Sequence, residues 1–359
     1  MKVACYFTGR SVFGGAERRI GRIMNGVAKQ GIDIEFVFTL FEPLEIIKAA
    51  FINAIGEPCS IDFKGFDNGW DVAKHIIREK FDVVFYVGAY RKMLPFFLGA
   101  KYAKSKTVLL QVSTGPSVGQ FGSFHEKIEF QFVARNSDQI DCLYPSTTGS
   151  FQNKYRKQIV TTTPCPATDL NRFVPSCKEK KIVFISRWVK GKNVELFVES
   201  VLLIEDYLFD NGYKVLLCGK SQDGSIETAV ERQLQKAKHP ELVIMPGFIN
   251  SEEILPNAEV FMSLQNINNY PSQSLLEAIA CGCYIIASDE GDTRLLVKPE
   301  FGVCCGLTTN AIANCIRAYI EKSSSEKKQI IYNGRSFAEK TFDIRKSIDH
   351  YTRIITDRS

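Results

Sequence analysis

The sequence predicts an α/β protein made of two doubly wound, Rossmann-like domains, each built on a parallel sheet. The chain has 359 residues, more than one ordinary hydrophobic core accommodates, so two domains are expected. Short apolar runs alternate with segments of helical periodicity along the whole chain. The alternation restarts after residues 161–175, TTTPCPATDLNRFVP, which contain three prolines and are expected to link the domains.

The first domain is expected at residues 1–165. Buried strands are predicted where apolar runs occur, at residues 2–8, 34–39, 83–87, 108–112 and 140–144. The first helix follows residues 9–15 and carries Ala16, Ile20, Ile23 and Val27 on one face. Further helices are predicted at residues 42–55, 70–78 and 91–104. Residues 113–124, rich in Gly, Ser and Phe, are predicted to form a loop at the sheet edge.

The second domain is expected at residues 166–335. Its predicted strands are residues 181–186, 214–218, 242–245, 260–264 and 284–287, and its predicted helices are residues 194–204, 225–237, 252–255 and 272–280. Gly282 follows the last of these helices, where a C-cap glycine belongs. Residues 325–353 are predicted as one amphipathic helix, and residues 336–359 to pack back toward the first domain. Two sheets joined by a linker are expected to face each other across a cleft.

Composition and charge exclude several classes of protein. With 45% hydrophobic and 24% charged residues, the chain is an ordinary globular protein without an apolar run long enough to span a bilayer. Its first residues do not have the pattern of a signal peptide, so a cytoplasmic location is expected. The first 175 residues hold 22 Lys and Arg against 16 Asp and Glu. This excess suits solubility, an anionic substrate or peripheral binding at the inner face of the membrane, and nucleic-acid binding is not expected.

The cysteines and histidines give no metal-binding pattern. None of the eleven cysteines forms a CxxC pair, and the closest spacings are Cys281-x-Cys283 and Cys304-Cys305. The four histidines also lack ligand spacing. We therefore expect reduced core thiols and no metal or other cofactor.

Residues 266–297 contain the strongest signal for a site. They read as a strand end, a polar loop, a helix that carries Glu277, and another strand. The helix N-terminus offers backbone amides at Ser272, Gln273, Ser274 and Leu275, which favour an anion.

Two cations in residues 187–193, Arg187 and Lys192, are expected at the same edge of the sheet. Together with that helix N-terminus they suit a diphosphate, and Glu277 can accept hydrogen bonds from a ribose diol. The pair Gly14 and Gly15 offers backbone amides at the start of the first helix, and we assign this pair to the binding of the same diphosphate-containing ligand.

On these residues the chain resembles the retaining GT-B glycosyltransferases of glycosyltransferase family four, the glycosyl transferases group 1. The matching segments are GGAER at 14–18, DLNRF at 169–173, SRWVKGKN at 186–193 and SLLEAIACG at 274–282. The resemblance implies metal-independent transfer, with retention, of a sugar from a nucleotide-diphosphate sugar to a hydroxyl of a glycan or lipid-linked acceptor. It further implies a role in surface polysaccharide or lipopolysaccharide biosynthesis, with Arg187 and Lys192 on the donor diphosphate and Glu277 on the ribose.

Two positions depart from the pattern of that family. Where its motif has a first Glu, eight residues before Glu277, this chain has Asn269, or Asn268 if the register moves by one. An amide can bond a donor hydroxyl but supplies no negative charge.

The family's usual His after strand 108–112 is also missing. Ser113 and Thr114 stand there, and we assign them to the acceptor side together with His125. A catalytically weak GT-B domain that binds a nucleotide sugar or a protein partner is therefore an alternative, and a phosphorylase or epimerase of the same architecture is a third.

Overall fold

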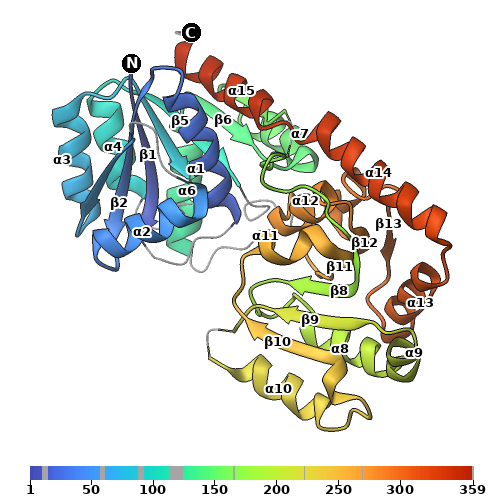
Figure 1. Ribbon diagram of the computed structural model, residues 1–359. Helices are drawn as coiled ribbons and strands as arrows, with labels where there is room; N and C mark the ends of the chain where they lie inside the picture. Colours follow the sequence, from blue (N-terminus) through green and yellow to red (C-terminus); the bar gives the residue numbers. More distant parts are fainter. Residues whose placement is uncertain are drawn as a thin grey trace. The chain divides into compact units, whose positions relative to one another are not determined.

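The computed structural model describes residues 1–9, 15–56, 61–87, 93–112, 124–164, 166–221, 223–268 and 270–357. The chain divides into two compact units (Figure 1). Unit 1 comprises Met1–Cys165 and Ile344–Ser359, and unit 2 comprises Pro166–Asp343. Each unit contains a parallel sheet with helices around it, which confirms the predicted fold class of two Rossmann-like units.

Unit 1 is organised around a seven-stranded parallel sheet of order β3-β2-β1-β4-β5-β6-β7. Its strands are β1 (Lys2–Gly9), β2 (Asp33–Leu40), β3 (Ile61–Phe66), β4 (Val83–Val87), β5 (Lys106–Gln111), β6 (Gln139–Cys142) and β7 (Ile159–Thr162). Its helices in the described residues are α1 (Gly15–Ala28), α2 (Leu44–Ile55), α3 (Gly69–Glu79), α4 (Met93–Tyr102), α6 (Phe124–Asn136), α7 (Pro145–Lys154) and α15 (Ile344–Thr356).

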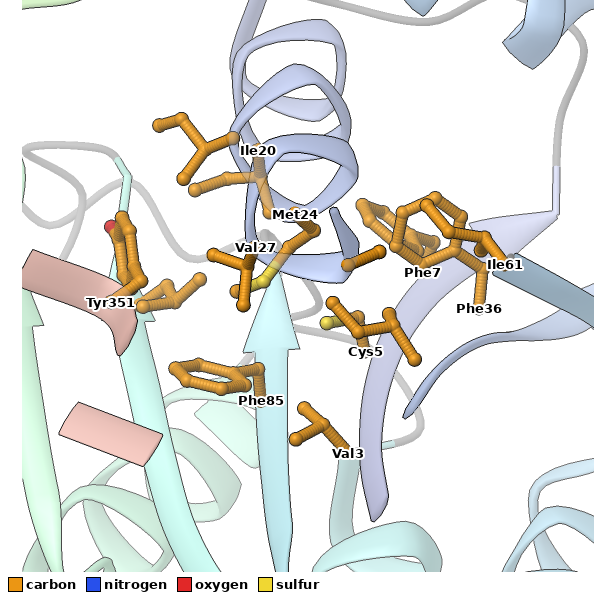
Figure 2. Close-up of a cluster of buried hydrophobic side chains, with 14 of the residues drawn as sticks. Val3, Cys5, Phe7, Ile20, Met24, Val27, Phe36, Ile61, Phe85 and Tyr351 are labelled. Atoms are coloured by element: carbon orange, nitrogen blue, oxygen red, sulfur yellow. The ribbon is translucent and has the colours of Figure 1, made fainter. Parts of the chain in front are cut away.

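Both faces of this sheet are buried, as a parallel sheet requires. On one face, α1 directs Ile20, Met24 and Val27 onto the strands, and each of these side chains is fully buried (Figure 2). Val3, Cys5 and Phe7 of β1 face the same cluster, whereas Ala4 and Tyr6 face the helices α3, α4 and α6. The apolar runs of the sequence therefore became central strands because helices cover them on both sides.

A buried polar cluster attaches α15 to unit 1. The carboxylate of Asp141, on β6, accepts hydrogen bonds from His350 Nε2 at 2.8 Å and from the Tyr351 hydroxyl at 3.0 Å. The hydroxyls of Thr161 and Thr163 donate to it at 2.6 and 2.8 Å. Burial alone would raise the pKa of Asp141, but the hydrogen bonds and the charge of His350, with the two threonine hydroxyls, hold that pKa below its ordinary value.

Unit 2 contains a six-stranded parallel sheet of order β10-β9-β8-β11-β12-β13. Its strands are β8 (Glu179–Ile185), β9 (Lys214–Cys218), β10 (Val243–Gly247), β11 (Ala258–Ser263), β12 (Tyr284–Ser288) and β13 (Gly302–Cys305). Its α-helices are α8 (Val194–Leu202), α9 (Glu205–Asp210), α10 (Ser225–Leu234), α11 (Ser251–Ile254), α12 (Gln273–Ala280), α13 (Thr309–Ile320) and α14 (Ser324–Thr341). Short 3-10 helices are η1 (Pro240–Leu242), η2 (Leu255–Asn257) and η3 (Gly291–Leu295).

The C-terminal segment differs from the sequence-based prediction. Instead of one helix at 325–353, the structure has α14 in unit 2 and α15 in unit 1. Phe342, fully buried, and Asp343 separate them. The helix stops there because the backbone of Asp343 pairs with Thr168 in a parallel bridge, which requires an extended conformation. Other elements absent from the prediction are β3, α6, α7, β7, α9, β13 and α13.

The remaining global expectations concern membranes and thiols. Every helix in the described ranges is too short or too polar to cross a bilayer. The cysteines that the structure describes are free thiols. The buried ones are Cys5, Cys142, Cys218, Cys281, Cys283 and Cys305.

We predict that Asp141→Asn loosens α15 from unit 1. The substitution removes the charge that His350 and Tyr351 bond, so the free energy of unfolding of unit 1 should fall by roughly 3 kcal/mol. Urea unfolding and hydrogen exchange of the α15 amides measure the effect. In the wild-type protein this contribution should be complete above about pH 4 and lost as the pH falls through the lowered pKa of Asp141. The control Asp71→Asn, at an exposed carboxylate on α3, should leave the urea midpoint nearly unchanged.

Candidate functional site

The candidate site lies where the strand order of unit 2 reverses. Starting at β8, the chain adds β9 and β10 on one side and then crosses to add β11 on the other. At such a switch point the loops that leave two neighbouring strands diverge, and ligands bind in the space beyond the carboxyl ends. The two loops here are residues 186–193, after β8, and the described residues 264–268 and 270–272, after β11.

These two loops are joined through their backbones. Asn266 N donates a hydrogen bond to Gly191 O at 3.2 Å. Gly191 has φ 92° and Asn193 has φ 53°, so the chain turns tightly in the left-handed region on both sides of Lys192. A Cβ atom at Gly191 would lie 2.5 Å from Asn266 Oδ1, so a side chain at this position would force the Asn266 amide to move.

The indole of Trp188 anchors the loop after β8. Trp188 is 2% exposed, and its backbone N–H donates to Lys220 O at 3.0 Å. Gly219, with φ 137°, lies below it, and a Cβ there would come within 1.9 Å of Ser186 O. The neighbouring Arg187 is exposed, so its guanidinium projects from a fixed backbone.

The Lys192 ammonium is held inside this loop arrangement. Nζ donates to Gln265 Oε1 at 2.5 Å. Burial, and after it the nearby positive charge of Arg187, lower the pKa of Lys192 to about 8. The structure thus brings the two predicted cations together, in a setting where positive charge lacks full solvation.

Gln265 was missed by sequence reasoning. Its side chain is 8% exposed, and Nε2 donates to Ser263 Oγ at 3.1 Å. Its backbone N–H donates to Ser288 Oγ at 2.8 Å. The only available signal was its place, directly after the predicted strand 260–264, and an uncharged amide there does not indicate a role.

The N-terminus of α12 lies beside the end of β8. Ser274 Oγ donates to Ile185 O at 3.5 Å, and Gln273 Nε2 donates to Ala167 O at 3.3 Å. The N-cap residue Ser272 makes no side-chain capping bond, and Leu275 is buried beneath the first turn. Amides at this helix start are therefore available to an anion near the Arg187 loop.

Glu277 lies one turn further along α12. It is 1% exposed, and its Oε2 accepts a hydrogen bond from Ser251 Oγ, on α11, at 2.7 Å. The carboxylate is thus already oriented by a hydroxyl, the same kind of donor that a ribose diol offers. Its contact with ribose stays a prediction.

Asn268 is engaged by its own surroundings. Nδ2 donates to Asp292 Oδ2 at 3.1 Å, and Oδ1 accepts from the backbone N–H groups of Tyr270 and Asp292, each at 3.3 Å. Gly291 leaves room for it, because a Cβ there would lie 2.2 Å from Asn268 Cγ. The structure therefore places this predicted donor ligand against a buried carboxylate, and its role toward a donor stays a prediction.

The other predicted residues fall into two groups. Gly15 is the first residue of α1, and His125, exposed, is the second residue of α6. Four further residues lie outside the described part of the chain, namely Gly14, Ser113, Thr114 and Asn269.

The described site has the chemistry of a polyanion site. Arg187, Lys192 and the N-terminus of α12 supply positive charge from two loops. Within the described ranges, no three His, Cys, Asp or Glu residues are grouped so that they could hold a metal ion. That the reaction proceeds without a metal stays a prediction.

Comparison with known proteins places this geometry in context. The family model described as glycosyl transferases group 1 matches residues 169–337, which lie within unit 2. A search of curated proteins gives no match.

Solved structures match over the whole chain. HepE of Anabaena, in complex with UDP and glucose, is 14% identical, with 99% of each chain covered and a TM-score of 0.81. WaaG, a glycosyltransferase involved in lipopolysaccharide biosynthesis, is 15% identical, with 99% of this chain and 100% of that chain covered and a TM-score of 0.73. The pneumococcal O-GlcNAc transferase GtfA is 11% identical, with 99% and 98% covered and a TM-score of 0.74. The protein therefore has the GT-B fold of these glycosyltransferases, and residues 169–337 of its second unit are similar to the glycosyl transferases group 1 family.

Proposed function

We propose that this protein is a retaining glycosyltransferase. It moves a sugar from a nucleotide-diphosphate sugar to a hydroxyl of a glycan or lipid-linked acceptor, in the synthesis of surface polysaccharide or lipopolysaccharide. The observation that carries the proposal is the half-buried Lys192 ammonium beside Arg187, at the switch point of a unit that is similar to the group 1 family. The complexes of HepE with UDP and with UDP-glucose, and the role of WaaG in lipopolysaccharide biosynthesis, support the substrate classes.

In this proposal, residues of unit 2 stabilise the negative charge that develops on the leaving diphosphate. As the glycosidic bond breaks, negative charge grows on the donor diphosphate, and Arg187, Lys192 and the amides of α12 stabilise it where it develops. Glu277 accepts hydrogen bonds from the ribose diol. The acceptor hydroxyl attacks the face that the diphosphate leaves and gives its proton to a leaving phosphate oxygen, so the anomeric configuration is retained. These steps require no metal.

A second candidate function is a GT-B domain that binds a nucleotide sugar or a protein partner with little catalysis. The observation that favours it is the side chain of Asn268, which is committed to Asp292. Asn269, or Asn268 if the register moves by one, stands where the family motif has an acid. Such a domain would show saturable binding of a nucleotide sugar without product. Thermal shift with uridine, guanosine, adenosine and thymidine diphosphates identifies the base, and incubation with the matching sugar donors then separates transfer from binding.

We predict that Lys192→Ala lowers kcat/KM for the nucleotide sugar by about 10²- to 10³-fold, because a charge that opposes the developing phosphate anion is lost. Assays of released nucleotide measure the rate, and the anomeric proton coupling in the product reports retention. The matched control is Lys190→Ala, at an exposed lysine of the same loop, which should keep nearly full activity. Equal turnover of Lys192→Ala and the control would contradict the assignment, and loss of activity in EDTA would contradict a metal-free reaction.

We predict that kcat/KM falls as the pH rises through about 8. The pKa of Lys192 is lowered to about 8 by burial and by Arg187, so the ammonium is present below that pH and lost above it. Above the midpoint the decline should approach tenfold per pH unit. A bound diphosphate favours the ammonium, so kcat should hold to higher pH than kcat/KM. A flat profile between pH 7 and pH 10 would show that the ammonium is not required.

Unit 1 has a surface suited to a membrane, which would bring the protein to a lipid-linked acceptor at the inner face. Helices α4 and α6 touch through the rings of Phe97 and Phe132. Their outer sides expose the large apolar residues Leu98, Tyr102, Phe124, Ile128 and Phe132. Exposed Lys104, Lys127 and Arg135 lie on or next to these helices. Aromatic side chains beside cations suit the headgroup region of an anionic bilayer.

We predict that Tyr102→Ser combined with Ile128→Ser weakens binding to vesicles of phosphatidylglycerol and phosphatidylethanolamine by about tenfold, because apolar surface is removed from the interface. Co-sedimentation measures the partition. The control Tyr332→Ser changes an aromatic on α14, in unit 2, whose exposure of 67% lies between those of Ile128 and Tyr102, and it should bind like the wild type. If all three proteins stay in the supernatant, the protein is not a peripheral membrane protein of this kind.

A further inference from the structure

We propose that Gln265 is a positioning residue that holds the Lys192 ammonium in place for a phosphate of the donor. The inference rests on the proposed function, because it assigns Gln265 a part in the binding of the diphosphate. Gln265 is not among the residues that the sequence motifs indicate. It is identified by its contact, since its Oε1 accepts from Lys192 Nζ at 2.5 Å.

The amide of Gln265 is fixed before any ligand arrives. A glutamine side chain has an acceptor end and a donor end, and only the acceptor end can bond an ammonium. Nε2 is taken by Ser263 Oγ at 3.1 Å, and the backbone N–H is held by Ser288 Oγ at 2.8 Å. Ser263 is 8% exposed and Ser288 is 2% exposed, so both supports are buried in the strand ends. Oε1 is therefore left facing Lys192.

An uncharged acceptor suits this position. It takes one of the three ammonium protons and leaves two for phosphate oxygens, while the full positive charge is kept. A carboxylate at the same place would cancel that charge and repel the diphosphate. An aliphatic side chain would leave the ammonium short of a partner in a half-buried setting, which favours the neutral amine.

The charged groups around Lys192 do not replace this contact. Arg187, on its own loop, acts on it with charge of the same sign. The strand end and loop packed against it present Ser263, Gln265 and Ser288, which are uncharged. Of the nearby acids, Asp289 is paired with Arg294, and Asp292 bonds Asn268.

The first test measures the titration of Lys192 in the ligand-free protein, from the ¹³Cε shift assigned with Lys192→Arg. Gln265→Leu should lower the titration midpoint by about one pH unit, because a hydrogen bond to a charged group is lost. Gln265→Glu should raise it by one unit or more. Ser263→Ala, which keeps Gln265 but frees its amide, should lower the midpoint by less than Gln265→Leu. The matched control is Gln329→Glu on the exposed face of α14, which should leave it unchanged.

The second test measures binding of uridine diphosphate and of inorganic pyrophosphate by calorimetry at pH 6 and pH 8. Gln265→Leu should bind like the wild type at pH 6 and about fivefold more weakly at pH 8, where the protonated fraction of Lys192 falls from about one half to about one tenth. Gln265→Glu should bind about tenfold more weakly at both pH values. A purely structural Gln265 would instead give losses that do not depend on pH.

The two inferences fail separately. If the Lys192 midpoint is the same in the wild type, Gln265→Leu, Gln265→Glu and Ser263→Ala, the positioning role is wrong, whatever the protein binds. If the midpoints move as expected but neither uridine diphosphate nor pyrophosphate binds the wild type, Gln265 holds Lys192 while the phosphate ligand assigned to it is wrong. Shifted midpoints together with pH-dependent binding support both.

Discussion

The site in unit 2 depends on one backbone contact, the hydrogen bond from Asn266 N to Gly191 O. It joins the loops that leave β8 and β11, the two neighbouring strands at which the order of strand addition reverses. Glycine is favoured at 191, because φ is 92° and a Cβ would lie 2.5 Å from Asn266 Oδ1. Gly191 immediately precedes Lys192, and Asn266 immediately follows Gln265. The hydrogen bond between Gly191 and Asn266 therefore holds the backbones of Lys192 and Gln265 close to each other. The Lys192 to Gln265 hydrogen bond follows from this proximity.

The charge properties of the site follow from this geometry. A lysine on an open loop would keep its ordinary pKa, but here burial beside Arg187 lowers that pKa to about 8. The protein offsets part of this penalty with a neutral acceptor rather than with a carboxylate. A cation that is incompletely compensated by the protein is one that gains most from an incoming anion. The uncompensated positive charge of the site thus favours binding of an anion such as a diphosphate.

The sequence predicted the fold class, the sheet strands nearest the switch points, and the meeting of Arg187 with Lys192, because long apolar runs and loop positions are local signals. It did not predict β13, whose four residues include a glycine and two cysteines, or α13, which follows it. It treated residues 325–353 as one helix because the bridge between Thr168 and Asp343 joins positions far apart in the chain. Gln265 was missed for a similar reason, since its importance comes from Lys192, Ser263 and Ser288 and not from its own residue type.

The anomaly at Asn268 also has a physical reading. In a loop of this family pattern an acid is expected at 268 or 269, but the Asn268 amide already donates to Asp292, which is 7% exposed. A second carboxylate within hydrogen-bonding distance of Asp292 would force one of the two to take up a proton. The Asn268 amide is therefore a suitable hydrogen-bond partner for the Asp292 carboxylate. A Glu at position 268 alone would not add a negative charge to the loop. Asp292 belongs to η3, which follows β12, so the acid that bonds this loop comes from the next strand end along the sheet.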